Sequence, residues 1–206
     1  IDQFLIKFLK KQQSSLLVRP MKYGVISGGK KIRSTIIFDT GKIFNISEKK
    51  LINICAAVEC IHSYSLIHDD LPCMDNDTIR RGKPATHIKF GEASAVLAGS
   101  SLLTLAFEIV ADKKYLLSPK EKNEIIKSLA SCSGHTGIAG GQELDLKFEN
   151  KKKRIKQIID MQKKKTGKLF NFCLYAVGAV AKKKTKEKLF LSNLGEEIGL
   201  LFQLAD

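Results

Sequence analysis

Apolar and polar positions follow a helical period along most of this chain. Near the start, Phe4, Leu5, Phe8 and Leu9 recur at helical spacing among lysines and glutamines, which predicts an amphipathic helix over residues 1–18. No alternating run bounded by hairpin turns and no internal repeat is evident. The pattern therefore predicts an all-α fold of about eight helices or more, arranged as a bundle around a central cavity whose facing helices carry the acids.

Start signals and periodicity place the other predicted helices. A helix is expected to open within Gly28–Arg33, and another to follow Ser47 as N-cap and run to the acids at 69 and 70. A third helix is expected over 91–111. A fourth starts at the capping box 118–121 and runs to a glycine-rich end at 140–145, and the last covers about 186–206. No linker-like tract divides them, so we expect one domain over 1–206.

The densest chemistry lies in residues 59–84. The apolar helix there ends in adjacent carboxylates, Asp69 and Asp70, and Pro72 cannot continue a regular helix, so Asp75 is expected from a turn. Adjacent carboxylates repel, and a divalent cation between them allows both to stay ionised. Because Mg²⁺ prefers a few carboxylates together with the phosphate oxygens of a substrate, this stretch predicts a magnesium site.

Basic residues near these acids point to a phosphate ester. Arg80 and Arg81 follow the acids, and planar guanidinium groups match phosphate better than they match the neighbouring carboxylates. His62 lies on the same helix face as Asp69, roughly 10 Å away. Upstream, the backbone amides of a helix start, with Lys30 and Arg33 three apart on one face, would make a diphosphate cradle.

These motifs together resemble the trans-polyprenyl diphosphate synthases. The resemblance rests on Asp-Asp-Leu-Pro-Cys-Met-Asp at 69–75 with Arg-Arg-Gly at 80–82, on the glycine-lysine run at 28–33, on Gly-Gln-x-x-Asp at 141–145, on Lys-Thr at 165–166, and on Phe-Gln-x-x-Asp at 202–206. The two extra residues between the acids and the aromatic Tyr64 are most similar to the bacterial farnesyl diphosphate synthases. Lys31 and Ser34 depart from the family's pattern. Everything after the first aspartate of the second acidic motif is missing, so we expect the domain to be incomplete at its C-terminus.

The resemblance implies a fold and a role for each matching residue. The fold would be the isoprenoid-synthase helical bundle. The implied roles are metal ligands at Asp69, Asp70, Asp75 and Asp206; allylic diphosphate and carbocation contacts at Arg80, Lys165, Thr166 and Gln203; isopentenyl diphosphate contacts at Lys30, Arg33, His62 and Arg81; a chain-length floor at Tyr64 and Ser65; and a catalytic cavity lined by Gln142 and Asp145. About three Mg²⁺ ions would bind with substrate, with Mn²⁺ as an alternative. Residue 167 is a glycine that would let the helix open near Lys165, so that backbone carbonyls turn inward.

The implied reaction condenses dimethylallyl or geranyl diphosphate with isopentenyl diphosphate to form farnesyl diphosphate, as a step of isoprenoid biosynthesis. A geranylgeranyl diphosphate synthase, a noncatalytic partner subunit and a metal-dependent phosphohydrolase remain alternatives. The family also implies a homodimer.

Composition changes this picture little. The net charge of +14 comes mainly from lysines spread along the chain, and clustered basic faces with interleaved aromatics are lacking, so we expect no nucleic-acid partner. The odd number of cysteines without a C-x-x-C pair predicts buried thiols in a reducing cytoplasm. No signal peptide is visible and the longest apolar stretch, 169–181, is too short for a bilayer, so we expect a cytoplasmic protein without stable membrane insertion.

Overall fold

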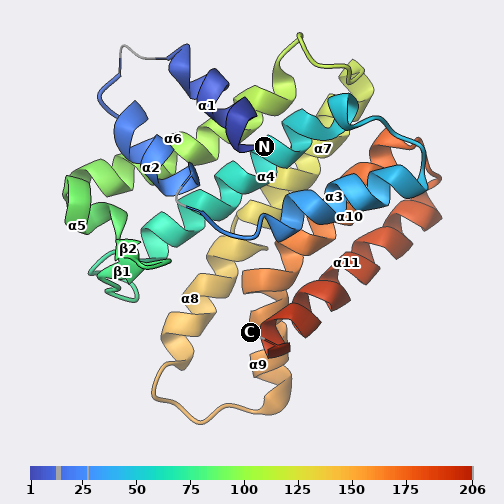
Figure 1. The fold of residues 1–206 in the computed structure, drawn as a ribbon. Helices are drawn as coiled ribbons and strands as arrows, with labels where there is room; N and C mark the ends of the chain where they lie inside the picture. Colours follow the sequence, from blue (N-terminus) through green and yellow to red (C-terminus); the bar gives the residue numbers. More distant parts are fainter. Residues whose placement is uncertain (13–14, 27, 206) are drawn as a thin grey trace. The chain divides into compact units, whose positions relative to one another are not determined.

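The computed structural model describes residues 1–12, 15–26 and 28–205, and these residues form α-helices almost throughout (Figure 1). Eleven α-helices, one π-helical turn and one short hairpin occur among them, which confirms the all-α prediction. The chain divides into two compact units, Ile1–Ile32 with Ile52–Asp112, and Arg33–Leu51 with Lys113–Asp206. The single domain expected over 1–206 stays a prediction.

The first unit packs N-terminal helices against a long apolar one. Its elements are α1 (Asp2–Lys10), α2 (Val18–Ile26), the greater part of α4 (Glu48–Asp69), β1 (Ile79–Arg80), β2 (Lys83–Pro84), α5 (Thr86–Phe90) and α6 (Glu92–Ala111). Helix α2 contacts α1, α5 and α6 (Figure 1). The fully buried side chains include Leu5, Leu9, Leu102 and Ile109, so the apolar stripe predicted near the N-terminus does face a core.

The second unit is organised around α10. Its elements are α3 (Ile32–Ile43, which begins at the boundary), the start of α4, α7 (Pro119–Ser133), α8 (Ile138–Phe148), α9 (Ile155–Gln162), the π-helix η1 (Lys163–Gly167), α10 (Lys168–Val180) and α11 (Thr185–Ala205). Helix α10 contacts both α7 and α11 (Figure 1). Phe170 and Phe172 of α10 are fully buried, as are Ile125 and Leu129 of α7.

Glycines let α11 approach α10 closely. A Cβ at Gly195 would lie 2.4 Å from the carbonyl oxygen of Phe170, and one at Gly199 would lie 2.8 Å from Cα of Gly167. Both distances are shorter than any real Cβ contact, so the packing requires glycine at these positions.

Several predicted helix boundaries are correct. Helix α4 begins directly after Ser47 and ends at Asp69, as predicted. The capping box of α7 is complete: Ser118 Oγ accepts a hydrogen bond from the Glu121 amide at 3.3 Å, and the Glu121 carboxylate accepts one from the Ser118 amide at 2.6 Å. The predicted helices over 91–111 and about 186–206 correspond to α6 and α11.

Other predicted boundaries are wrong. The first helix ends at Lys10, not at 18. The separate helix α2 was not predicted, because Pro20 and Gly24 obscure its helical period. Pro20 is tolerated there because it lies in the first turn, where a missing N–H costs no intrahelical bond. The segment at 28–31 precedes α3 instead of opening it. Gly28 and Gly29 have φ of 98° and 110° and Lys31 has φ of 50°, which are not helical values, so Lys30 does not share a helix face with Arg33.

Two further differences concern turns. The helix predicted from 119 to about 145 is two helices, because the chain breaks at Gly134 and Gly137, and the glycines at 140 and 141 lie inside α8 instead of at a helix end. The hairpin of β1 and β2 pairs Ile79 with Pro84 and is too short for its side chains to show alternation.

Two helices are long and apolar enough to cross a membrane. Their mean hydropathies are 1.2 for α4 and 1.7 for α6, and 72% and 44% of their most apolar windows are buried inside the protein. The sequence-based expectation named only the stretch 169–181 and missed both. A buried core helix of a globular protein has the same length and composition.

All five cysteines are free thiols, as predicted. Cys55, Cys60, Cys132 and Cys173 are buried, and Cys73 is exposed. Burial raises the pKa of the Cys60 thiol to about 12, so it is uncharged at neutral pH.

Candidate active site

The turn after α4 holds two of the predicted acids. The backbone amide of Asp75 donates a hydrogen bond of 2.9 Å to the carbonyl oxygen of Asp69, and the amide of Asn76 reaches the Leu71 carbonyl at 3.1 Å. Asn76 takes a left-handed φ of 55°, which asparagine tolerates better than most residues. Asp75 is therefore presented from a turn whose backbone folds back on the helix end, as predicted.

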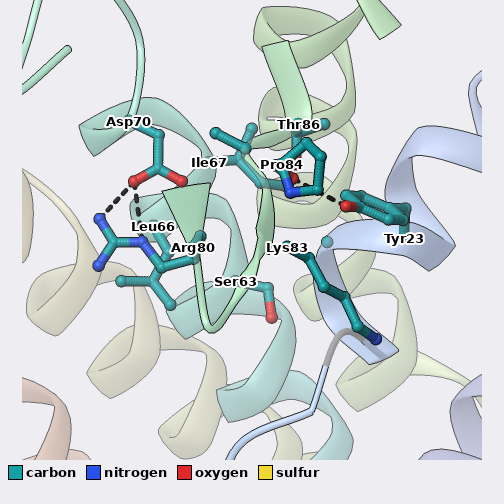
Figure 2. Close-up of a pocket in the computed structure, with 11 residues that line it drawn as sticks. Tyr23, Ser63, Leu66, Ile67, Asp70, Arg80, Lys83, Pro84 and Thr86 are labelled. Carbon is teal, nitrogen blue, oxygen red and sulfur yellow. Dashed lines mark hydrogen bonds and ion pairs between the residues drawn. The ribbon is translucent and has the colours of Figure 1, made fainter. Parts of the chain in front are cut away.

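Asp70 is held by an arginine within the same unit. Its side chain is only 3% exposed, and Arg80 donates to Asp70 Oδ1 from Nε at 2.9 Å and also from its terminal nitrogen (Figure 2). The same guanidinium donates to the exposed Asp77 at 3.0 Å. Burial raises the pKa of Asp70 while the hydrogen bonds from Arg80 oppose that rise, and the bond to Asp70 raises the pKa of Arg80. In the structure Arg80 is held by Asp70 and Asp77, and the expectation that it binds a phosphate stays a prediction.

Arg81 lies against the glycine loop and His62. Its guanidinium donates to the carbonyl oxygen of Gly28 and lies 3.4 Å from His62 Nε2. A Cβ at Gly29 would lie 2.7 Å from Cζ of Arg81. Gly29 therefore leaves the space that the arginine fills, and the structure brings the predicted pair His62 and Arg81 together. Lys30, in the same loop, is exposed.

Tyr64 and Ser65 lie further back in α4. The Tyr64 side chain is 7% exposed, its ring meets that of His68 edge to face at a centroid distance of 5.7 Å, and burial raises the pKa of its hydroxyl to about 12. Ser65 donates its hydroxyl proton to the His62 carbonyl oxygen at 2.9 Å. Tyr64 is thus a buried, uncharged aromatic side chain behind the acids, and its role as a floor stays a prediction.

In the second unit, the π-helix presents Lys165 and Thr166. The Lys165 ammonium lies 2.5 Å from Asp145 Oδ2 of α8, and the buried Thr166 donates its hydroxyl proton to Gln203 Oε1 of α11 at 2.9 Å. A Cβ at Gly141 would lie 2.2 Å from the Lys165 amide nitrogen, so this glycine allows α8 to pack directly against the π-turn. The predicted opening of the helix at this point is confirmed.

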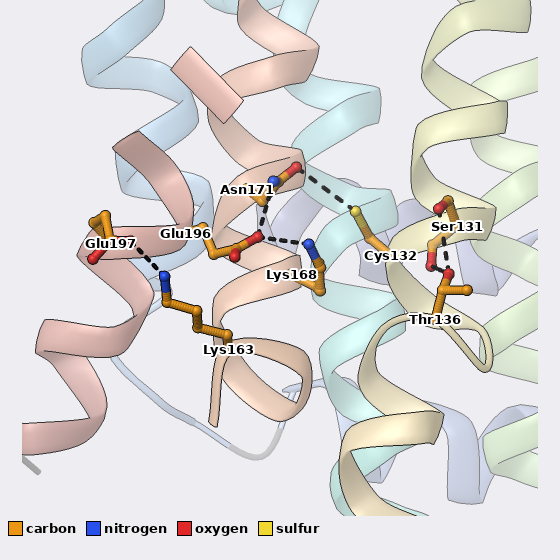
Figure 3. Close-up of polar contacts among 8 residues, drawn as sticks. All are labelled: Ser131, Cys132, Thr136, Lys163, Lys168, Asn171, Glu196 and Glu197. Carbon is orange, nitrogen blue, oxygen red and sulfur yellow. Dashed lines mark hydrogen bonds and ion pairs between the residues drawn. The ribbon is translucent and has the colours of Figure 1, made fainter. Parts of the chain in front are cut away.

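Ion pairs fix the π-turn and α10 to α11. Lys163 pairs with Glu197 at 2.7 Å and Lys168 pairs with Glu196 at 2.6 Å (Figure 3). Lys163 and Lys165, at the two ends of the lysine run 163–165, thus both have carboxylate partners. Within the same unit, Arg33 of α3 lies 4.9 Å from the centre of the Phe170 ring, which in turn packs on Phe202 of α11 at 5.5 Å.

Comparison with known proteins decides the family. The family model described as polyprenyl synthetase matches residues 14–206. The chain belongs to the polyprenyl synthetase family. It is 43% identical over 196 residues to the farnesyl diphosphate synthase of Escherichia coli (strain K12), covering 94% of this chain and 66% of that protein. It is 39% identical to the farnesyl diphosphate synthase of Bacillus subtilis (strain 168), covering 92% of this chain and 64% of that one.

Solved structures agree. The apo structure of an FPP/GFPP synthase from Zymomonas mobilis matches with a TM-score of 0.89 and 38% identity, covering all of this chain and 81% of that one. The chain thus spans about two thirds of the length of the curated relatives named above.

Within this polyprenyl synthetase chain, the predicted site residues fall into two sets. His62, Tyr64, Ser65, the three acids of 69–75, Arg80, Arg81 and Lys30 belong to the first unit, and Arg33, Gln142, Asp145, Lys165, Thr166 and Gln203 belong to the second. The predicted ligand Asp206 lies outside the described residues. Asp77 was not predicted as a residue of the site. Its position three residues before Arg80 is the spacing of a local ion pair, and this spacing could have identified it as a partner of Arg80.

The acids fit magnesium in chemistry but are not gathered as a metal site. Among residues 1–12, 15–26 and 28–205, no group of three His, Cys, Asp or Glu side chains is arranged to hold a metal ion. Carboxylate oxygens are the donors that Mg²⁺ prefers, and Asp69 and Asp75 supply them at the end of α4. Asp70 accepts hydrogen bonds from Arg80, so its predicted role is to support the metal ligands Asp69 and Asp75.

Proposed function

We propose that this protein condenses geranyl diphosphate with one isopentenyl diphosphate, or dimethylallyl diphosphate with two in succession, and releases farnesyl diphosphate with one inorganic diphosphate per condensation. The observation that carries the proposal is the identity of 43% to a farnesyl diphosphate synthase across 94% of the chain. The His62–Arg81 pair beside the glycine loop and the opened helix at Lys165 agree with it, because the reaction needs sites for two diphosphates and for a carbocation.

Magnesium would be held by Asp69 and Asp75, with Asp70 supporting them and Asp206 as a further ligand. When bound, Mg²⁺ neutralises the charge that develops on the leaving diphosphate. Arg80 and Lys165 would add cationic hydrogen-bond donors to the same group, since each is already held in place by a carboxylate.

The second substrate would be held by the loop before α3. Lys30, Arg33, His62 and Arg81 are its proposed contacts. Arg81 donates to a backbone carbonyl in the structure, and a bound diphosphate would replace that neutral acceptor with a charged one. The bound substrate would point its double bond at the allylic carbon.

Heterolysis of the allylic carbon–oxygen bond leaves both electrons on the diphosphate and an allylic cation. Thr166, the Lys165 carbonyl and Gln203 would stabilise this cation with negative dipole ends and no nucleophile stronger than a hydroxyl or amide. The double bond of isopentenyl diphosphate then supplies the electrons of the new carbon–carbon bond. The proton lost in the final step goes to the released diphosphate, so no side-chain base is required.

Tyr64 and Ser65 are proposed to limit the product to fifteen carbons. The buried phenol ring behind Asp69 is bulky enough to block a channel that runs along α4. The alternative product is geranylgeranyl diphosphate. We further propose a cytoplasmic homodimer that binds neither nucleic acid nor membrane stably.

Incubating the protein with isopentenyl diphosphate, either allylic diphosphate and Mg²⁺ tests the reaction. Chromatography of the dephosphorylated products should give farnesol, and Asp69→Asn should abolish it. Geranylgeraniol would establish the alternative product. Diphosphate release without a new carbon–carbon bond would favour the phosphohydrolase, and a folded but inactive protein that activates a separate synthase would favour the partner subunit.

A further inference from the structure

A basic groove lies in the first unit between α2, β2 and α5. Its volume is about 430 Å³, within the range of small-molecule sites, which is roughly 300–1,000 Å³. Four of its lining side chains are cationic: Arg19, Lys22, Lys83 and Lys89. No carboxylate lines it.

These cations are not neutralised by the protein. No ion pair joins any of the four to an acid within the described part of the chain. Gathering like charges in one concave site focuses their field and raises the local concentration of anions. An anion bound among them would relieve their mutual repulsion.

The rest of the groove is apolar. Tyr23 and Phe90 meet edge to face at 5.3 Å, and Ile26 lies beside them. Lys89 Nζ lies 4.2 Å from the centre of the Tyr23 ring, so the ammonium group covers the aromatic surface. The Tyr23 hydroxyl donates to the Pro84 carbonyl at 2.8 Å, which fixes the ring and occupies its polar end.

None of the acids of the candidate active site lines the groove. Figure 2 shows the Lys83 side chain extending on the Tyr23 side of the hairpin while Arg80 extends toward Asp70. The cavity between them measures about 20 Å³, enough for one water molecule and too small for a shared ligand. The groove is therefore a separate site.

We infer that this groove binds a phosphate ester that carries an alkyl chain, with the phosphate among the four cations and the chain on Tyr23, Ile26 and Phe90. The inference does not depend on prenyl transfer. The same chemistry is offered by a free phosphorylated metabolite and by a phospholipid head group.

A second groove provides the control. It measures about 620 Å³ and lies against α7 and α10, and its acid Glu124 and its lysine Lys168 already have partners within the second unit. Lys120 and Lys127 line this second groove and are exposed, so they are the same kind of residue as the lysines of the basic groove. Removing two lysines from either groove changes the net charge equally.

The test is calorimetric titration of the protein with monomeric octyl phosphate in EDTA. Lys22→Gln with Lys89→Gln should weaken binding about tenfold or more, since each removes a charge-assisted contact. Lys120→Gln with Lys127→Gln should leave it within about twofold. Equal effects of the two double variants would overturn the inference.

Two further arms identify the ligand. Inorganic phosphate should bind more weakly than octyl phosphate, and equal affinity would refute the role of the apolar floor. Sedimentation with phosphatidylcholine vesicles containing phosphatidic acid distinguishes the source. Vesicle binding that needs Lys22 and Lys89 supports a lipid head group, whereas octyl phosphate binding without vesicle binding supports a free metabolite. Binding in neither arm contradicts the proposed site.

Discussion

At the scale of single residues, Asp70 carries a buried charge that the guanidinium of Arg80 balances. Its partner Arg80 also reaches the half-exposed Asp77. Removing one member of a buried charged pair leaves the other unsatisfied, whereas an exposed pair contributes little.

Asp70→Asn is therefore expected to lower the free energy of unfolding by about 1–3 kcal/mol. Asp77→Asn, which removes an exposed acceptor from the same guanidinium, should cost less than about 1 kcal/mol. Urea denaturation of both variants measures the difference. Equal losses would show that burial of the Asp70 carboxylate does not matter.

Tyr64 is expected to set product length if the proposed reaction is correct. Tyr64→Ala removes the ring and should extend the products beyond fifteen carbons, as measured by chromatography of the alcohols. Tyr64→Phe keeps the ring and should leave the product unchanged. An unaltered product from the alanine variant would remove Tyr64 from this role.

At the scale of helices, a charged cluster joins α7, α10 and α11. Glu124 of α7 accepts a hydrogen bond from the Tyr175 hydroxyl of α10 at 2.8 Å and pairs with Lys188 of α11. Burial alone would raise the pKa of Glu124, but the bonds from Lys188 and Tyr175 outweigh burial and hold the pKa below its usual 4.5. In return, the phenol pKa of Tyr175 is raised to about 12 by burial and by Glu124.

The lowered pKa of Glu124 means that this cluster stabilises the protein less as the pH falls. Because the folded-state pKa of Glu124 is lower than the unfolded value, its contribution is present above about pH 4.5 and is lost as the pH falls through the folded pKa. Glu124→Gln should remove that part of the acid dependence, seen as a smaller drop in unfolding free energy between pH 6 and about pH 3. Glu143→Gln, at an exposed pair with Lys147, is the control and should leave the dependence unchanged.

The approach of α11 to α10 depends on Gly195. Gly195→Ala would place a methyl group 2.4 Å from a backbone oxygen, which no side-chain rotation relieves. Overpacking of this kind costs about 1–3 kcal/mol, measurable by thermal denaturation. Asn193→Ala on the exposed face of the same helix should change stability by less than about 0.5 kcal/mol. A stable Gly195→Ala protein would mean that the two helices can separate at little cost.

Helices with a local start signal could be predicted from the sequence, and those without one could not. The box at Ser118 marks the beginning of α7 through side chains that bond nearby amides, and α4 begins directly after the predicted N-cap residue Ser47. In contrast, α2 contains Pro20 and Gly24, and its helical state follows from burial against α6, a contact distant in sequence. The break between α7 and α8 lies at Gly134 and Gly137, where a Cβ on Gly137 would lie 1.9 Å from the Cys132 carbonyl oxygen, a clash that the sequence does not reveal.

At the scale of the whole molecule, the excess of 35 basic over 21 acidic residues gives a field that attracts diphosphates. Raising the ionic strength from about 0.01 M to 0.15 M shortens the screening length from about 30 Å to about 8 Å. The kcat/KM for prenyl transfer should therefore fall severalfold, with kcat nearly constant. A kcat/KM that does not respond to salt would exclude electrostatic attraction of substrate.

Residue types of the candidate site could be predicted, but their present partners could not. The sequence identifies Arg80 and Lys165 as cations near acids, because spacing and motif order suffice for that. Their actual partners depend on how side chains of separate elements are placed: Arg80 is held by Asp70, and Lys165 is held by Asp145. Charge alone does not choose between a neighbouring carboxylate and a substrate phosphate.

The π-turn at Lys163–Gly167 also has a consequence for insertions and deletions. A π-turn contains one residue more than an α-helical turn of the same rise, so it sets the rotational phase of α10 relative to α9. Deleting one lysine there would leave a regular helical turn of the same rise, so α10 would keep its rotational phase. Inserting one more residue would exceed what the π-turn holds and would turn α10 by about 100° about its axis, which would carry Phe170 and Phe172 out of the core together. The segment between Gln162 and Lys168 should therefore tolerate the loss of one residue better than the gain of one.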